Sequence, residues 1–151
     1  MSKRDYRKLS GVTAGIILGI LIYLAPWLLF PVCKKPVETA AGTLIPMACF
    51  WVYRYTSAIG VLIVIVSALT LTVKDLPAKR AMFIILTILG VYTALSPMYT
   101  FGIPIGFGAM CLSPQHMCRL NTMPALFVLG SILAFIGLVA TVVQKEIVEE
   151  E

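Results

Sequence analysis

Residues 11–30 read GVTAGIILGILIYLAPWLLF, an apolar stretch without a single charged side chain. About 20 apolar residues in a helix cross the roughly 30 Å hydrocarbon core of a bilayer. Three further stretches, at 48–73, 81–98 and 123–143, have the same apolar character. Backbone polar groups in lipid must be hydrogen-bonded within the chain, so each stretch is expected to be a helix. The sequence therefore predicts an all-α fold, an integral membrane four-helix bundle that occupies residues 1–151 as one domain.

The composition agrees with lipid as the main solvent of this chain. Of its 151 residues, 60% are hydrophobic and 13% are charged, whereas soluble domains carry about 25% charged residues. The charges gather in the tails and in a predicted loop at 74–80. Basic residues interleaved with aromatics, as in a nucleic-acid-binding surface, are missing outside the apolar stretches. Membrane lipid with anionic headgroups is therefore a better partner for the basic ends than nucleic acid.

Loop charges predict the orientation, because basic residues accumulate on the cytoplasmic side of a membrane. If both termini are cytoplasmic, the inner side carries eight basic residues and the outer side carries three. The inner residues are Lys3, Arg4, Arg7, Lys8, Lys74, Lys79, Arg80 and Lys145, and the outer residues are Lys34, Lys35 and Arg119. The N-terminus and the C-terminus are therefore both expected to face the cytoplasm.

All four cysteines then lie at the outer side, Cys33 and Cys49 around the first external loop and Cys111 and Cys118 in the second. Disulfides are the default state of thiols in an oxidising compartment. Four cysteines permit three pairings, and Cys33–Cys49 with Cys111–Cys118 would close the smallest loops. We expect two short extracytoplasmic loops closed by structural disulfides, with connectivity and redox state left open.

Two functional interpretations of the cysteines stay open beside the structural one. A redox-active pair usually has C-x-x-C spacing, which this chain lacks. A metal site could use Cys111, His116, Met117 and Cys118, because thiolate, imidazole and thioether suit copper(I) or zinc. However, zinc-binding cysteines usually lie two to four residues apart, and six residues separate Cys111 from Cys118. The favoured interpretation therefore has no cofactor.

Arg54 is the one charged residue inside a predicted span. It lies about 9 Å below the outer edge of its helix at a rise of 1.5 Å per residue. The aromatic residues Trp51, Tyr53 and Tyr55 beside it fit an interfacial belt. We favour an arginine that extends toward the headgroups. The alternative is a cation that faces the bundle and binds an anionic group or a partner subunit.

Small residues repeat along the first span. Gly11, Gly15 and Gly19 stand at every fourth position, a spacing that lets two helix backbones approach closely in lipid. Gly90 and Ala94 repeat the pattern in a shorter form on the third span. Packing within the bundle is favoured over a seam between two copies, so a homo-oligomer stays open.

The sequence leans against an enzyme. It contains no Gly-x-Ser-x-Gly nucleophile motif, no phosphate-binding loop, no His–Glu metal motif and no paired carboxylates in a span. The favoured function is an accessory or scaffold subunit of a membrane complex. The alternatives are a membrane thiol–disulfide oxidoreductase and a protein that handles copper or zinc at the outer face.

Five short motifs carry a resemblance to a known family. They are CKKP at 33–36, MACFW at 47–51, Arg54, MCR at 117–119 and MPAL at 123–126. The chain resembles a prokaryotic family of small four-span membrane proteins with outer-face cysteines, classified only as a domain of unknown function. The resemblance implies a place in a prokaryotic plasma membrane and an association with ABC-type export systems of the macrolide-exporter kind. It assigns no activity and no substrate.

Overall fold

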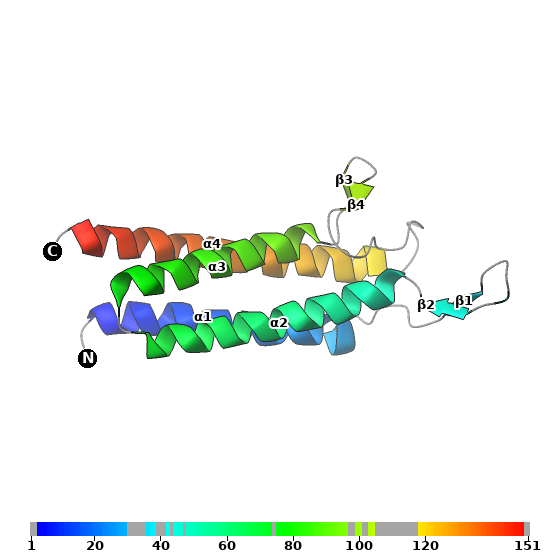
Figure 1. The fold of residues 1–151 in the computed structure, drawn as a ribbon, viewed down its shortest axis with the longest axis horizontal. Helices are drawn as coiled ribbons and strands as arrows, with labels where there is room; N and C mark the ends of the chain where they lie inside the picture. Colours follow the sequence, from blue (N-terminus) through cyan, green and yellow to red (C-terminus); the bar gives the residue numbers. More distant parts are fainter. Residues whose placement is uncertain are drawn as a thin grey trace.

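Figure 1 shows the fold in the computed structural model. The structure describes the backbone at residues 3–29, 36–38, 42, 44–46, 48–73, 75–96, 99–100, 103–104 and 118–149, and side chains mainly inside the apolar helical segments. The helices are α1 (Lys3–Leu24), α2 (Ala48–Thr72), α3 (Leu76–Leu95) and α4 (Met123–Glu149). The segments long and apolar enough to cross a membrane are Gly11–Leu29, Arg54–Thr72, Leu76–Leu95 and Leu120–Val143. The predicted helical fold with four candidate spans is thus confirmed.

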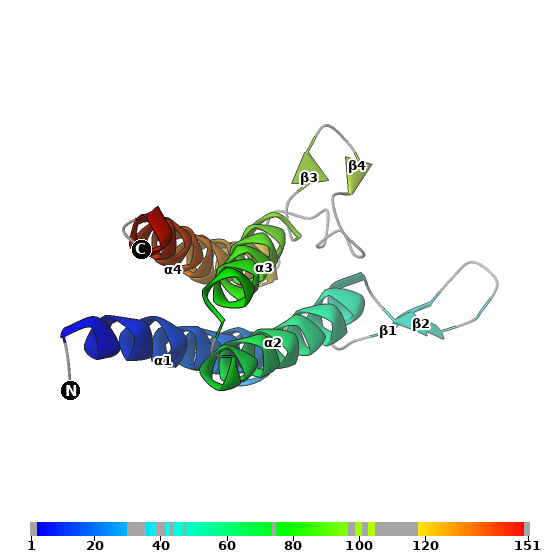
Figure 2. The same cartoon turned by 60° about the vertical axis from the view of Figure 1, so that its left-hand side comes forward.

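The helices form two antiparallel hairpins. α1 packs chiefly against α2, and α3 packs chiefly against α4, with smaller contacts of α2 with α3 and of α1 with α4. The two views show the hairpins as two layers that lie side by side (Figures 1 and 2). Both ends of the chain and the turn between α2 and α3 lie at one end of the bundle (Figure 1). We call this the terminal end and the other the hairpin end.

Prolines lie at helix boundaries, but one of them lies at a different place from the one that the sequence predicts. The sequence predicts Pro77 in the connection between the second and third spans, whereas it lies in the first turn of α3. A proline is accommodated there because its missing N–H would have no partner in a first turn. α3 therefore begins at Leu76, and most of the expected loop 74–80 is helical. Pro26 lies in a π-helical turn, η1 (Ala25–Leu29), that follows α1.

Two small β-hairpins occupy the hairpin end of the molecule. β1 (Pro36–Glu38) pairs with β2 (Leu44–Pro46), and β3 (Tyr99–Thr100) pairs with β4 (Ile103–Pro104), both antiparallel. Gly42, between β1 and β2, has a φ of 73°, a left-handed conformation that glycine adopts without steric cost. A second π-helical turn, η2 (Cys118–Thr122), leads into α4.

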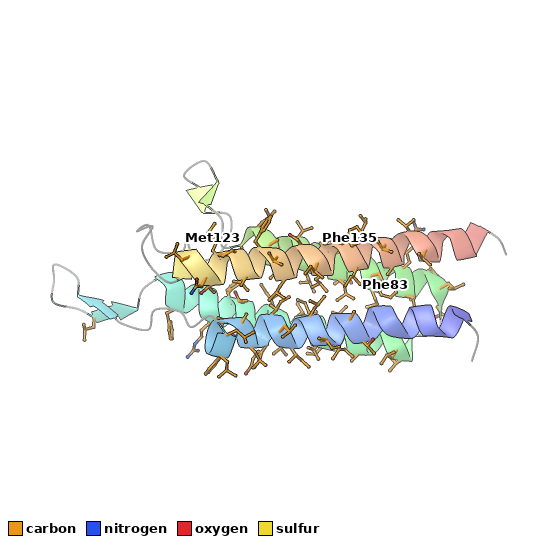
Figure 3. All side chains as sticks on the ribbon, turned by 180° about the vertical axis from the view of Figure 1, so that it is seen from behind. Phe83, Met123 and Phe135 are labelled. Atoms are coloured by element: carbon orange, nitrogen blue, oxygen red, sulfur yellow. The ribbon has the colours of Figure 1, made fainter. Side chains whose placement is uncertain are left out.

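An apolar cluster fills the space between the helices. Its buried members are Val12, Leu18, Ile22, Ile59, Ile63, Val66, Phe83, Leu86 and Leu133, which come from all four helices. Phe83 is 4% exposed and lies between the helices, whereas Phe135 is 67% exposed and points away from the bundle (Figure 3). Large apolar side chains cover the outside of each helix as well, which suits a lipid environment.

Candidate functional site: two seams of small residues

α1 and α2 approach each other closely where Gly19 faces Gly60. A Cβ placed on Gly60 would lie 2.7 Å from the backbone N of Tyr23 and 2.9 Å from the carbonyl O of Gly19. A Cβ placed on Gly19 would in turn lie 3.1 Å from the carbonyl O of Gly60. The two backbones therefore touch directly, and no side chain larger than hydrogen fits at Gly60 without moving a helix. We call this contact the α1–α2 seam.

A second contact of the same kind joins α3 to α4. A Cβ on Gly90 would lie 2.5 Å from the backbone N of Ala134, and a Cβ on Gly130 would lie 2.5 Å from the backbone N of Ala94. Farther along, a Cβ on Gly137 would lie 2.6 Å from the Oγ1 of Thr87. We call this contact the α3–α4 seam. Each helix contributes small residues to it, so the contact is reciprocal.

The physical reason for both seams is the solvent. Lipid tails are as apolar as leucine, so little hydrophobic driving force brings two spans together, and dispersion contacts at short range must hold them. At Gly60, the position that a Cβ would occupy lies 2.9 Å from the carbonyl O of Gly19, so the absence of a side chain is what lets the two backbones meet. The seams thus make each hairpin a packed unit.

The structure places the three glycines of the first span in different surroundings. Gly19 lies in the α1–α2 seam, and a Cβ on Gly15 would lie 2.6 Å from the Oγ of Ser67. Gly11 has more space around it, since the atom nearest to a Cβ placed there would be the Cε1 of Phe83, at 4.0 Å. Gly15 and Gly19 therefore face α2. Sequence reasoning missed their partners Gly60 and Ser67, because α2 has no repeated glycines that mark one face.

Ser67 is an unusual polar residue in the α1–α2 seam. Its side chain is 0% exposed, and its Oγ has no hydrogen-bond partner within the described part of the chain. Other hydroxyls in the bundle bond to their own helix: Thr70 donates to the carbonyl of Val66 at 2.8 Å and Thr93 to that of Leu89 at 2.7 Å. An unpaired buried hydroxyl costs about 1–3 kcal/mol. Ser67 therefore adds little stability to the seam.

This pair gives a testable double-mutant cycle. Gly15→Ala should destabilise the protein by about 1 kcal/mol, because the new methyl group meets the Ser67 oxygen. Ser67→Ala should be neutral or stabilising, since it removes an unpaired polar group. The double variant should regain most of the loss, because the Ser67 Cβ would lie 3.4 Å from the new methyl group, an ordinary contact. The free energy of unfolding of all three variants is measured in mixed micelles. If Gly15→Ala lowers it equally with Ser67 and with Ala at position 67, the proposed contact between these two positions is contradicted.

Polar and aromatic contacts gather toward the hairpin end. Trp27 Nε1 donates a hydrogen bond to Ser57 Oγ at 3.1 Å, which ties η1 to α2. The rings of Tyr55 and Tyr92 lie 6.4 Å apart at 43°, which ties α2 to α3. The first contact lies within the first hairpin and the second links the two layers, in a region where aromatic residues suit the membrane interface.

Arg54 lies on α2 in this same region. Its side chain is exposed, and its Cζ lies 5.4 Å from the centroid of the Phe50 ring, one turn earlier. A cation over an aromatic face contributes about 0.5–1 kcal/mol at an exposed site. An exposed Arg54 on an outer helix face can reach the headgroups or a neighbouring protein.

The cysteine and metal predictions fall mostly outside the described residues. Cys33, Cys111, His116 and Met117 lie in segments that the structure does not describe. The backbone of Cys49 lies in the first turn of α2, and that of Cys118 begins η2, so the antiparallel fold puts both at the hairpin end. In the described part of the chain, no three of His, Cys, Asp or Glu group as metal ligands. The disulfides, the redox pair and the metal site stay predictions.

Four apolar helices with seams of small residues define the class of this chain, a multi-pass helical membrane protein. The chain belongs to the family described as "Domain of unknown function (DUF4418)", whose family model matches residues 15–143. The match includes parts of all four helices, so membership in an uncharacterised family, as the resemblance implied, is confirmed. No curated protein and no solved structure matches the chain.

Proposed function

We propose that this chain is an accessory or scaffold subunit that assembles with larger membrane proteins and performs no chemistry itself. The main support is that the seam glycines make close contacts within the two hairpins and not on the outer surface. These glycines are Gly19, Gly60, Gly90 and Gly130. Each hairpin is therefore complete, and large apolar side chains remain on the outside for lipid or for a partner's helices.

The nature of the interior also supports a non-transporting role. Among the described side chains, the buried polar residues are Thr56, Ser67, Thr70, Thr93 and Thr122, and none carries a charge. Ions and protons cross membranes along charged or hydrated paths. A bundle filled by the apolar cluster offers no such path in the region described. Transport, if the complex performs it, is therefore assigned to the partner.

The partner in this proposal is an ABC-type exporter in the plasma membrane of a prokaryote. That part rests on the family resemblance of the sequence motifs. The orientation, with both termini cytoplasmic, rests on the eight basic residues of one side against three of the other. It would place Cys49 and Cys118 on the outer side and the basic residues of α3 on the inner side.

The test is purification from native membranes in a mild detergent, followed by identification of what co-purifies. We expect a larger membrane protein in stable ratio, together with thiols that do not exchange. A stable isolated monomer with thiol-exchange turnover would reject the proposal in favour of the oxidoreductase. Free thiols with bound copper or zinc would reject it in favour of metal handling.

Surface variants make the test specific. Ile17, Leu62, Ile88 and Phe135 are exposed, and each lies on a different helix. Replacing each with alanine in turn should leave the unfolding midpoint of the isolated chain nearly unchanged, because these side chains are largely outside the packed interior. The variant on the partner-facing helix should lose the partner, and the other three serve as its matched controls. Full retention of the partner by every variant would argue against an interface on these four faces.

A further inference from the structure

α4 is the span with the largest uncovered apolar surface in the described part of the chain. Its segment Leu120–Val143 has a mean hydropathy of 2.7, against 1.5 to 2.2 for the other three spans, and the smallest buried share, 22%. One side of α4 is covered by the α3–α4 seam through Gly130 and Gly137. On the other side Phe135 points away from the bundle (Figure 3). A complete helix face is therefore left for lipid or for another helix.

Exposed residues recur along this face at alternating intervals of three and four. They are Val128, Ser131, Phe135, Leu138 and Val142. At 3.6 residues per turn they lie on the side of α4 opposite the buried Leu133. A mean interval of 3.5 residues is the spacing of a seam between two helices that cross at a small left-handed angle, the commonest crossing in membrane bundles. We call these five residues the α4 outer stripe.

Ser131 is the polar residue of the α4 outer stripe, and it lies in the middle of the span. Leu120 and Val143, the ends of the span, are each about 17 Å away along the axis at 1.5 Å per residue. The other exposed serine or threonine side chains of the described spans are Thr13 and Thr72, which lie within two residues of a span end. Headgroups and water can reach those two residues, whereas Ser131 lies in the centre of the hydrocarbon.

A hydroxyl at this depth has hydrogen-bonding capacity that lipid cannot use. Thr141 illustrates how a hydroxyl on α4 donates to its own helix, since its Oγ1 bonds to the carbonyl of Gly137 at 2.8 Å. A hydroxyl that donates in this way still has an acceptor position free, because its oxygen carries two lone pairs. Serine and threonine hydroxyls hydrogen-bond across helices in membranes. Ser131 is therefore suited to a neighbouring span that offers a donor at the same depth.

A second copy of this chain offers such a donor. Two copies inserted in the same orientation are related by a twofold axis along the bilayer normal, so residues at the same depth meet. Ser131 then faces Ser131 of the second copy, and one hydroxyl can donate to the other because each both donates and accepts. A single polar residue in an apolar helix seam fixes the register of pairing. The short side chain also lets the two backbones approach closely.

We propose that the α4 outer stripe is the interface of a parallel, symmetric dimer of this chain, in which the two Ser131 hydroxyls bond to each other at the centre of the membrane. This interface is separate from the α3–α4 seam, which uses the opposite side of α4. The dimer goes beyond the assembly role, because it does not depend on any larger partner protein. It leaves the outer faces of α1 and α2 available to such a partner.

The experiment uses the full chain, labelled at its N-terminus with donor or acceptor fluorophores and reconstituted in phosphatidylcholine vesicles. Energy transfer is followed as lipid is added, and wild type should keep transfer well above chance encounter. Ser131→Ala should weaken the dimer about threefold, the effect of an average interhelical hydrogen bond in a membrane. Ser131→Leu should weaken it further, because a bulky side chain holds the backbones apart. Ala68→Leu, at an exposed position of α2, is the control and should dimerise as wild type does.

A second arm identifies the face through which the copies meet. Ser131→Cys should form a disulfide-linked dimer when vesicles are oxidised, and Ile88→Cys, on the exposed side of α3, measures the background from the native cysteines. Circular dichroism should show unchanged helix content in all variants, because the substituted side chains are exposed. Chance-level transfer in wild type would overturn the proposal. Equal transfer in wild type, Ser131→Leu and Ala68→Leu, or equal cross-linking at positions 131 and 88, would overturn it as well.

Discussion

Gly90→Ala and Gly130→Ala are each expected to separate α3 from α4 or to weaken their contact strongly. The added methyl group would lie 2.5 Å from a backbone nitrogen of the facing helix in both cases. A flexible side chain could move aside, but a helix backbone cannot do so without shifting the whole helix. Overpacking a tight interior costs about 1–3 kcal/mol and occasionally more, and we expect the upper end here. Unfolding in mixed micelles, followed by circular dichroism, measures the loss.

The control for this prediction is Gly11→Ala. It makes the same chemical change in α1, yet its methyl group would lie 4.0 Å from the Cε1 of Phe83, an ordinary contact. We expect a change within about 0.5 kcal/mol, or a small gain from the better helix propensity of alanine. Similar losses in Gly11→Ala and Gly90→Ala would show that the α3–α4 seam is not the cause.

Gly60→Ala should have a comparable effect on the first hairpin. The new methyl group would lie 2.7 Å from the backbone N and 2.9 Å from the Cα of Tyr23. We again expect a loss at the upper end of about 1–3 kcal/mol, with α1 moved away from α2. A cysteine cross-linking pair across the α1–α2 seam would report the separation, alongside the unfolding midpoint.

Two comparisons sharpen the Gly60 experiment. Ala58→Leu adds more atoms to the same helix, but residue 58 is exposed, so we expect little change. Truncating a side chain of α1 should not rescue Gly60→Ala, because the obstacle is backbone, whereas Ser67→Ala should rescue Gly15→Ala. Rescue of Gly60→Ala by an alanine at Tyr23 would mean that a side chain, rather than the backbone, sets the seam.

The spans are predictable from sequence because a run of about 20 apolar residues is typical of a membrane helix and rare in a soluble domain. Gly15, Gly19, Gly90 and Ala94 are also visible in the sequence, because a four-residue spacing puts small residues on one helix face. The partners of these residues are harder to find. Lipid and the protein interior are equally apolar, so the sequence of α2 does not mark which face meets a neighbour. Gly130 and Ala134 do carry the same spacing, which could have paired α4 with α3.

Arg80 shows a second limit of prediction from sequence. Sequence alone places it among the basic residues of a loop, because Pro77 suggests that the third helix starts later. Pro77 instead lies in the first turn of α3, and this moves Arg80 into the helix and against the edge of the span. The Arg80 Nε is buried and has no hydrogen-bond partner within the part of the chain that the structure describes, and this depends on side-chain packing, which no spacing of residues encodes. The predictions for the cysteines rest on the sequence alone.

The division into two closed hairpins has a consequence for biogenesis. A chain emerges from the ribosome N-terminal end first, and early units fold before later ones are made. The residues of the α1–α2 seam, Gly19 and Gly60, are complete well before Gly90 has been synthesised. The first hairpin can therefore enter the bilayer and close as a unit, and the second can follow as another. Premature termination after the α2–α3 turn would then leave a stably inserted half-protein, which the cell's quality control would have to recognise by its uncovered inner face.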